Sequence, residues 1–205
     1  MFVIVALTML MYGFIHSWLA STTVKQFFRR LMGERRYFGL YRPIYNVFAI
    51  VTLSPIFGLV FLRPGYTLWQ VTGLGQLVFL LIQLVGLIGI IASLIQINVG
   101  KFIGLSQMVA YFQGQPLPLP TEPLQFGGVY RLVRHPLYLF SILLIWSMSS
   151  MSESLLAFNI GSTVYFVLGL VLEERKLSAA YGEPYHDYQR RTPAIIPFSK
   201  GFREL

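Results

Sequence analysis

The sequence predicts an all-α integral membrane protein with five transmembrane helices, an outside N-terminus, a cytoplasmic C-terminus and a cytoplasmic C-terminal helical tail. The first observation is composition: 55% of the 205 residues are hydrophobic and 12% are charged, whereas charged residues approach about a quarter of an ordinary soluble domain. The second is the recurrence of apolar runs that have the length of a spanning helix. The third is the gathering of basic residues in alternate segments between these runs.

The apolar runs define the spans. A spanning helix needs about 20 mostly apolar residues, and five runs approach or meet this length: 1–20, 44–62, 76–97, 137–151 and 155–172. Only the three residues 152–154 separate the last two runs, which predicts a tight hairpin of antiparallel neighbours. The first run lacks a preceding basic region, which favours a span over the alternative of a signal peptide. Residues 1–205 form one predicted domain.

The basic residues predict the orientation. Six lie in 21–43, three in 98–136 and six after residue 172, but only Arg63 lies in 63–75. The positive-inside rule therefore places the three basic segments in the cytoplasm. The formal net charge of +8 is thus an orientation signal with some attraction to membrane lipid, and nucleic acid is not predicted as a partner. The chain has no cysteine, which excludes disulfides and thiolate metal sites, and no metal site is predicted.

The first candidate cluster precedes the fourth span, where Arg134 and His135 stand before Pro136. Proline suits the first turn of a helix because its missing N–H has no intrahelical partner there. The two residues are therefore expected at a helix N-terminus, which favours anions, and a guanidinium adds affinity for a carboxylate or phosphate. The alternative is that Arg134 extends to lipid headgroups.

The second cluster is the pair Glu173 and Glu174 at the end of the fifth span. Both the helix dipole and the nearby hydrocarbon oppose two carboxylates at this position. Their presence predicts a cationic partner, which is either a ligand or one of Arg131, Arg134 and Arg175. A purely structural ion pair is the alternative. The hairpin brings this cluster close to the first one, on the cytoplasmic side.

The third cluster is aromatic. Tyr185 and Tyr188, three residues apart, share one face of a short helix in the tail. Such rings suit a flat heterocycle or a sulfonium cation, and an interfacial aromatic belt is the alternative. Two further histidines are candidates for contact with substrate. His186 lies between these tyrosines, and His16 lies near the cytoplasmic end of the first span, where a buried histidine satisfied by Ser17 or a carbonyl is the alternative.

These motifs carry a family resemblance. They follow one another as Gly128-x-Tyr130-Arg131-x-x-Arg134-His135-Pro136-x-Tyr138, Glu173-Glu174-x-x-Leu177 and Tyr181-Gly182-x-x-Tyr185-x-x-Tyr188. This order resembles the isoprenylcysteine carboxyl methyltransferase and phospholipid methyltransferase superfamily of integral-membrane enzymes, over about residues 127–197. Residues 146–177 are similar to bacterial methanethiol S-methyltransferases, and residues 16–21 and 41–46 also look like NnrU-type membrane proteins. Phe140 departs from the pattern, because many members have glycine there.

The resemblance implies an S-adenosylmethionine-dependent methyltransferase of a bacterial inner membrane, with its active site facing the cytoplasm. Residues 127–197 would bind the donor, through Tyr130, Arg134, His135, Pro136, Tyr138, Glu173, Glu174, Tyr185 and Tyr188. The implied catalytic residues are His135, Arg134 and Glu174, and the implied substrate contacts are His16 and His186. The acceptor would be a small thiol or a hydrophobic, lipid-like molecule; a thiol must lose its proton, to His135 or His186.

Three other functions stay open at this stage. Membrane sterol reductases that use NADPH have a similar fold and similar C-terminal motifs. A non-catalytic, NnrU-like membrane protein is the second alternative. A haem protein is the third, and it is disfavoured because only His16 lies within a predicted span, whereas haem ligation between helices needs facing histidines. The oligomeric state is not predicted.

Overall fold

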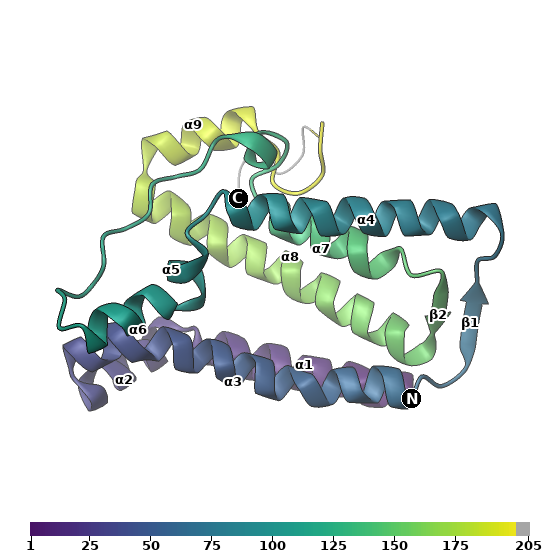
Figure 1. Ribbon diagram of the computed structural model, residues 1–205, viewed down its shortest axis with the longest axis horizontal. Helices are drawn as coiled ribbons and strands as arrows, with labels where there is room; N and C mark the ends of the chain where they lie inside the picture. Colours follow the sequence, from purple (N-terminus) through teal and green to yellow (C-terminus); the bar gives the residue numbers. More distant parts are fainter. Residues whose placement is uncertain (200–205) are drawn as a thin grey trace.

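The computed structural model describes residues 1–199 and is predominantly helical (Figure 1). Lys200 and Arg203, which contribute to the basic tail, lie outside the described residues. Along the chain the elements are α1 (Phe2–Leu19), α2 (Thr22–Met32), α3 (Glu34–Leu62), β1 (Thr67–Gln70), α4 (Leu74–Ile95), α5 (Val99–Ile103), α6 (Leu105–Phe112), the 3-10 turn η1 (Gly128–Arg131), α7 (Pro136–Trp146), β2 (Ser150–Ser152), α8 (Glu153–Tyr181) and α9 (Glu183–Arg191).

Four helices in the described part are long and apolar enough to cross a membrane, namely α1, α3, α4 and α8. They contain the second and fifth predicted spans and nearly all of the first and third. The fourth predicted span, 137–151, corresponds to α7, which has only 11 residues and is about 16 Å long at 1.5 Å per residue. The hydrocarbon core is about 30 Å thick. The protein is therefore a predominantly helical membrane protein, while five spans and their orientation are not confirmed.

The segment between α7 and α8 differs from the predicted tight hairpin. β2 pairs antiparallel with β1, with Thr67 opposite Ser152 and Gln70 opposite Ser150, so the fold contains a small sheet that the all-α prediction lacks. The Ser152 side chain accepts a hydrogen bond from the N–H of Leu155. The sequence Ser-Glu-Ser is thus the N-cap and first turn of α8, for which serine and an acidic residue are typical.

Glycines bring α4 and α7 close together. A Cβ atom at Gly86 would lie 3.0 Å from the backbone of α7, and a Cβ at Gly89 would lie 2.2 Å from the ring of Phe140. Phe140 is 7% exposed. The residue that departs from the family motif therefore fills the space that Gly89 leaves on α4, and its ring faces the neighbouring helix.

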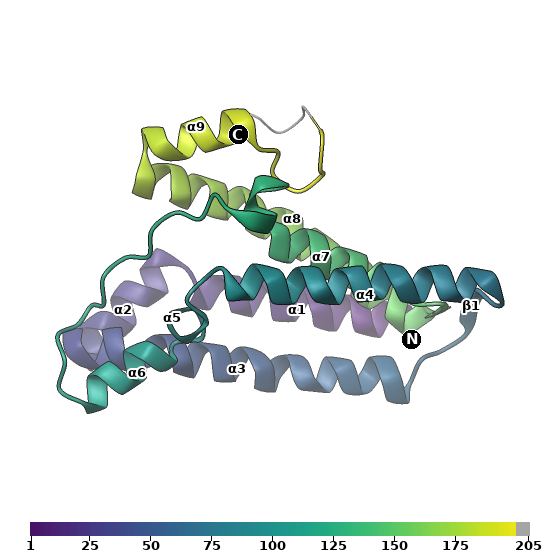
Figure 2. The same cartoon turned by 45° about the horizontal axis from the view of Figure 1, so that its top comes forward.

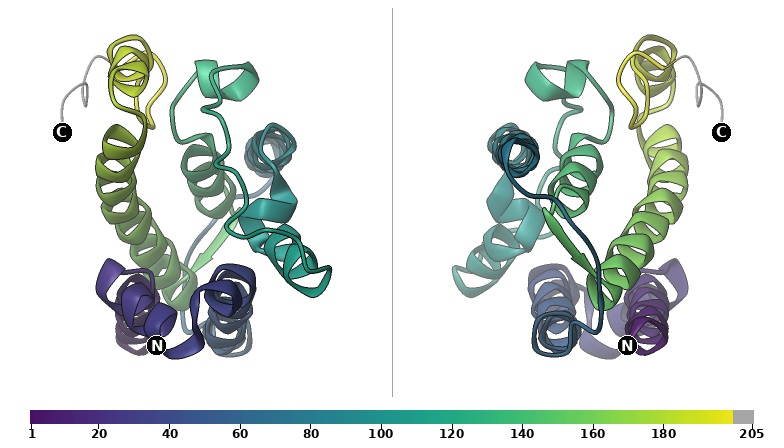
Figure 3. Two further views of the ribbon diagram at one scale, coloured as in Figure 1. Left: turned by 90° about the vertical axis from the view of Figure 1, so that its left-hand side faces the viewer. Right: turned by 90° about the vertical axis from the view of Figure 1, so that its right-hand side faces the viewer.

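The apolar core joins α1, α3 and α8. Its buried side chains are Val5, Met9, Ile56, Val60, Ala157 and Phe158. Viewed along the bundle, α1 and α3 lie side by side below α8, and α4 with α7 forms the other wall (Figure 3). The small sheet closes one end of the bundle, whereas α2, α5 and α6 lie at the other end, and α9 folds back along the last turns of α8 (Figure 2). This return places the tail beside the start of α7.

Candidate functional site

Glu174 is the centre of a buried polar cluster. Its side chain is 2% exposed and accepts five hydrogen bonds from four residues. Arg134 donates from Nε at 2.9 Å and from Nη2 at 2.6 Å, which is a bidentate pair. His135 Nε2 lies 2.6 Å away, the Tyr185 hydroxyl donates at 2.6 Å and Gln189 Nε2 donates at 2.7 Å. α7, α8 and α9 thus meet at one carboxylate, and both of its oxygens are engaged.

Arg134 also fastens the tail. Its Nη1 donates to the carbonyl oxygens of Thr192 at 2.6 Å and Gln189 at 3.3 Å. The N–H groups of Arg134 and His135 donate to the carbonyls of Pro193 at 2.9 Å and Ala194 at 3.0 Å. Arg134 is 5% exposed and pairs with Glu174, so it does not extend to lipid headgroups. The pair is the structural alternative that was considered for the two glutamates. The tail and the start of α7 are therefore held as one unit.

Glu173 differs from its neighbour, because 47% of its side chain is exposed. It accepts a hydrogen bond from the Tyr138 hydroxyl at 2.8 Å, and His135 Nδ1 lies 3.5 Å away. The rings of His135 and Tyr138 stack with their centroids 5.5 Å apart. Glu173 thus combines fixed protein partners with room for a further cationic partner.

His135 bridges the two carboxylates, one at each ring nitrogen. Burial alone lowers the pKa of this imidazole, but the hydrogen bonds and negative charges of Glu173 and Glu174 outweigh burial and raise the pKa above its ordinary value. The charged imidazole is therefore favoured in this cluster.

Tyr185 and Tyr188 are 1% and 7% exposed, so they pack inside the protein. The Tyr188 hydroxyl donates to the carbonyl of Tyr130 at 2.5 Å, which ties α9 to η1. Burial raises the pKa of both phenols, and for Tyr185 the bonded Glu174 raises it further. Both hydroxyls are thus neutral donors. Pro136 begins α7 and is fully buried.

The two remaining histidines lie in different surroundings. His186 is exposed on α9, with Nδ1 3.0 Å from Gln189 Oε1, so one glutamine links it to Glu174. The Tyr45 hydroxyl lies 2.6 Å from His16 Nε2, so the partner of His16 is this phenol, which neither alternative had named. The rings of Tyr12, Tyr45 and Tyr165 surround it at centroid distances of 5.4, 4.7 and 5.7 Å.

Sequence reasoning missed Gln189, which is 7% exposed and holds both Glu174 and His186. Its signal was present, because Gln189 follows Tyr185 by four residues, and residues at this spacing share a helix face.

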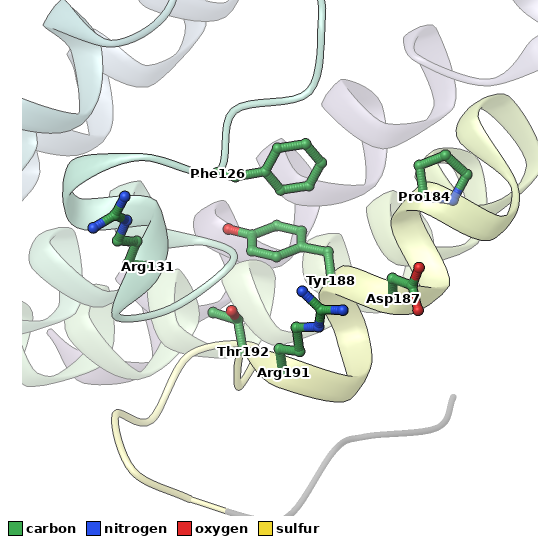
Figure 4. Close-up of a pocket in the computed structure, with 7 residues that line it drawn as sticks. All are labelled: Phe126, Arg131, Pro184, Asp187, Tyr188, Arg191 and Thr192. Atoms are coloured by element: carbon green, nitrogen blue, oxygen red, sulfur yellow. The ribbon is translucent and has the colours of Figure 1, made fainter.

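Two cavities accompany the cluster. One, of about 410 Å³, lies between η1 and α9 (Figure 4); its lining residues are Phe126, Arg131, Pro184, Asp187, Tyr188, Arg191 and Thr192. The other is an apolar groove of about 660 Å³ between α1 and α8, which runs from Phe2 to Leu172, the residue before Glu173.

Comparison with known proteins identifies the family. The sequence model of the NnrU protein family matches residues 4–175. The methanethiol S-methyltransferase of Crocosphaera subtropica is 32% identical over 187 residues, which cover 89% of this chain and 69% of the relative. Methanethiol S-methyltransferase 2 of Bradyrhizobium diazoefficiens is 32% identical over 136 residues, 66% of this chain and 52% of the relative.

A plant protein extends the comparison. Protein-S-isoprenylcysteine O-methyltransferase B of Arabidopsis thaliana is 34% identical over 76 residues, 35% of this chain and 38% of the relative. The chain thus spans only part of each relative, and no solved structure matches it. These matches confirm the superfamily resemblance that the motifs indicated. By the extent of the family match, the chain belongs to the NnrU protein family.

Proposed function

We propose that the protein is a membrane methyltransferase that uses S-adenosylmethionine and methylates a small thiol or a hydrophobic, lipid-like acceptor at the cytoplasmic membrane face. The names of its methanethiol S-methyltransferase relatives support the general activity. The observation that carries the proposal is that the two adjacent carboxylates differ. Glu174 is buried and both of its oxygens accept hydrogen bonds from protein groups, whereas the side chain of Glu173 is partly exposed.

The residues present fit the donor. S-adenosylmethionine has an ammonium group, a carboxylate, a sulfonium and an adenine ring. Glu173 retains acceptor capacity for the ammonium group, because a carboxylate offers about four lone-pair sites and two protein groups approach it. The stacked rings of His135 and Tyr138 offer an aromatic surface beside that carboxylate, and aromatic faces attract cations. We assign donor binding to this side of the cluster.

Arg134 and Glu174 take a positioning role in this proposal. All three guanidinium nitrogens of Arg134 contact Glu174 or tail carbonyls. Glu174 holds His135 and Tyr185 through hydrogen bonds. Arg134 binds the carbonyls of Gln189 and Thr192 and so positions α9, which also contains Tyr188. Rigid placement matters because methyl transfer is a displacement that depends mainly on alignment of the reacting groups.

When bound, S-adenosylmethionine supplies an electrophilic methyl group on a positively charged sulfur. With a thiol acceptor, His135 receives the thiol proton, which requires the neutral imidazole, so its raised pKa makes alkaline conditions favourable. His186 is the second proton acceptor in this scheme, because it is exposed and linked to the cluster through Gln189.

The apolar groove favours an acceptor that partitions into the membrane. Its lining follows α1 and α8 and ends at Leu172, directly before Glu173. Groove residue Gly169 also lies beside Tyr138, with its Cβ position 3.4 Å from the tyrosine hydroxyl, so a hydrophobic molecule in the groove would come close to the proposed donor site. His16 lies on α1 beside groove residues Gly13 and Ser17, which keeps it as a candidate contact for the acceptor.

A ligand titration tests the proposal. Detergent-purified full chain is heated with S-adenosylmethionine, S-adenosylhomocysteine or NADPH, because a ligand that binds only the folded state raises the apparent stability in a saturable way. We expect a shift with both adenosyl ligands and none with NADPH. A shift with NADPH alone would establish the reductase alternative, and no shift with any of them, in protein that unfolds cooperatively, would support the non-catalytic alternative.

A further inference from the structure

The cavity between η1 and α9 lies outside the donor site assigned above to Glu173, His135 and Tyr138, although Tyr188 lines it, and it has a distinct charge pattern. Arg131 and Arg191 line it from two different elements (Figure 4). Both are exposed, and within residues 1–199 neither guanidinium has a hydrogen bond or ion pair. The third charged lining residue, Asp187, is already paired with Arg190. The lining therefore carries two positive charges against one carboxylate, which Arg190 already binds.

The rest of the lining is suited to an organic ligand. The rings of Phe126 and Tyr188 meet at 90° with their centroids 5.0 Å apart, and Thr192 adds a hydroxyl. The volume of about 410 Å³ lies within the range of small-molecule sites, roughly 300–1,000 Å³.

The presence of two guanidinium groups, those of Arg131 and Arg191, indicates which kind of anion the cavity would bind. One guanidinium fork occupies both oxygens of a carboxylate, as Arg134 does on Glu174. A phosphoryl group has oxygens left for a second fork. We propose that this cavity binds the phosphoryl group of a phosphorylated ligand through Arg131 and Arg191, at a site separate from that of the methyl donor.

The occupant would act on the neighbouring cluster. η1 and α9 meet through the hydrogen bond from Tyr188 to Tyr130, and a phosphoryl group held by Arg131 and Arg191 adds a second link between the same elements. α9 also carries Tyr185 and Gln189, which bind Glu174. Binding in the cavity therefore stabilises the placement of the cluster, and saturable thermal stabilisation is the expected signature.

Two sources of phosphoryl group are tested in parallel on the detergent-purified full chain. Phosphatidylglycerol is the lipid probe, with diacylglycerol as the control that has the same tails without phosphate, and glycerol 3-phosphate is the soluble probe. Affinities come from native mass spectrometry and thermal-shift titration. The test variant is Arg131→Gln with Arg191→Gln. The charge-matched control is Arg30→Gln with Arg36→Gln, two arginines that are exposed on α2 and α3.

We expect at least one phosphoryl probe to bind the unchanged protein and to lose about tenfold or more in affinity in the test variant, since hydrogen bonds to charged groups are the strong ones. The control variant should keep its affinity. Dependence seen with phosphatidylglycerol alone identifies a lipid headgroup, and dependence seen with glycerol 3-phosphate identifies a soluble phosphate.

Three results would overturn the inference: no phosphoryl probe binds better than diacylglycerol, the two double variants lose affinity equally, or S-adenosylmethionine displaces the phosphoryl probe. Donor binding is titrated separately in every variant. If the phosphoryl probes fail these tests while S-adenosylmethionine still binds, this inference alone is rejected. If the unchanged protein does not bind S-adenosylmethionine at all, the proposed function is rejected.

Discussion

His135 and His16 each lie against tyrosine rings, but carboxylates complete the surroundings of only one of them. His135 stacks on Tyr138 and lies between Glu173 and Glu174. His16 contacts three tyrosine rings, and its ring nitrogen Nε2 meets the hydroxyl of Tyr45. The first cluster is held by charge and the second by neutral contacts.

The difference shows what each cluster is able to do. Buried charges depend strongly on every partner, because removal of one partner leaves the other without compensation. Ring contacts and neutral hydrogen bonds contribute smaller and more separable amounts. The ionic cluster therefore should respond to pH, to ligands and to single substitutions, whereas the aromatic cluster should respond weakly to all three.

The largest expected effect is that of Glu174→Gln, which leaves the buried guanidinium of Arg134 without its carboxylate. Loss of one partner from a buried pair typically costs about 3–5 kcal/mol. The free energy of unfolding, measured by reversible denaturation in mixed micelles, should fall by that amount. Glu173→Gln is the matched control one residue away, and its cost should be no more than about 1 kcal/mol, since its side chain is 47% exposed. Equal losses in the two variants would remove the distinction between the carboxylates.

Glu173→Gln should instead impair donor binding. The amide cannot supply the charge that attracts an ammonium group, and charge-assisted hydrogen bonds are the strong ones. We expect the Kd for S-adenosylmethionine to rise about tenfold or more, with the melting temperature of the ligand-free protein nearly unchanged. Glu34→Gln, on an exposed carboxylate of α3, is the control for loss of one negative charge. An unchanged Kd in Glu173→Gln would place the donor elsewhere.

The ionic cluster also shows which contacts could be predicted from the sequence and which could not. Connectivity was enough to predict that Arg134 and His135 meet Glu173 and Glu174, because α7 and α8 follow one another with only a short link. It was not enough to separate the two glutamates, since their exposure depends on which side of α8 the returning α9 covers. Adjacent residues on a helix point about 100° apart, so one covering helix buries only one of them.

Other features left weak or no signals in the sequence. The tail is held to the start of α7 by backbone groups of residues 193 and 194, and any residue type offers a backbone carbonyl. The pairing of β1 with β2 joins segments about 80 residues apart, and a strand of three or four residues is too short for a clear alternating pattern. The ring cluster around His16 combines α1, α3 and α8, whose mutual rotation only the packed core fixes.

Stability should depend on pH through His135. Its pKa is raised in the folded protein because both glutamates hold the charged imidazole. The resulting stabilisation is fully present below the ordinary histidine pKa of about 6.5, and it is lost as pH rises through the raised value. The melting temperature should therefore fall over this interval. In His135→Gln the dependence should flatten, and in His16→Gln it should persist. Persistence of the full slope in His135→Gln would assign it to another group.

The smallest expected effect is that of Tyr45→Phe, and it distinguishes a structural from a functional role for His16. Tyr45→Phe removes the hydroxyl at 2.6 Å from Nε2, and Tyr41→Phe is a matched control, because the Tyr41 hydroxyl donates to the Leu19 carbonyl at the same 2.6 Å. Each variant should lose about 0.5–1.5 kcal/mol of unfolding free energy, measured under the same denaturation conditions. The affinity for S-adenosylmethionine should stay unchanged in both. If His16 contacts the methyl acceptor, only Tyr45→Phe should raise the KM for the acceptor, because only this change frees the imidazole to reorient. Equal KM values in both variants and the unchanged protein would confine His16 to packing, leaving the ionic cluster as the chemically active one of the two.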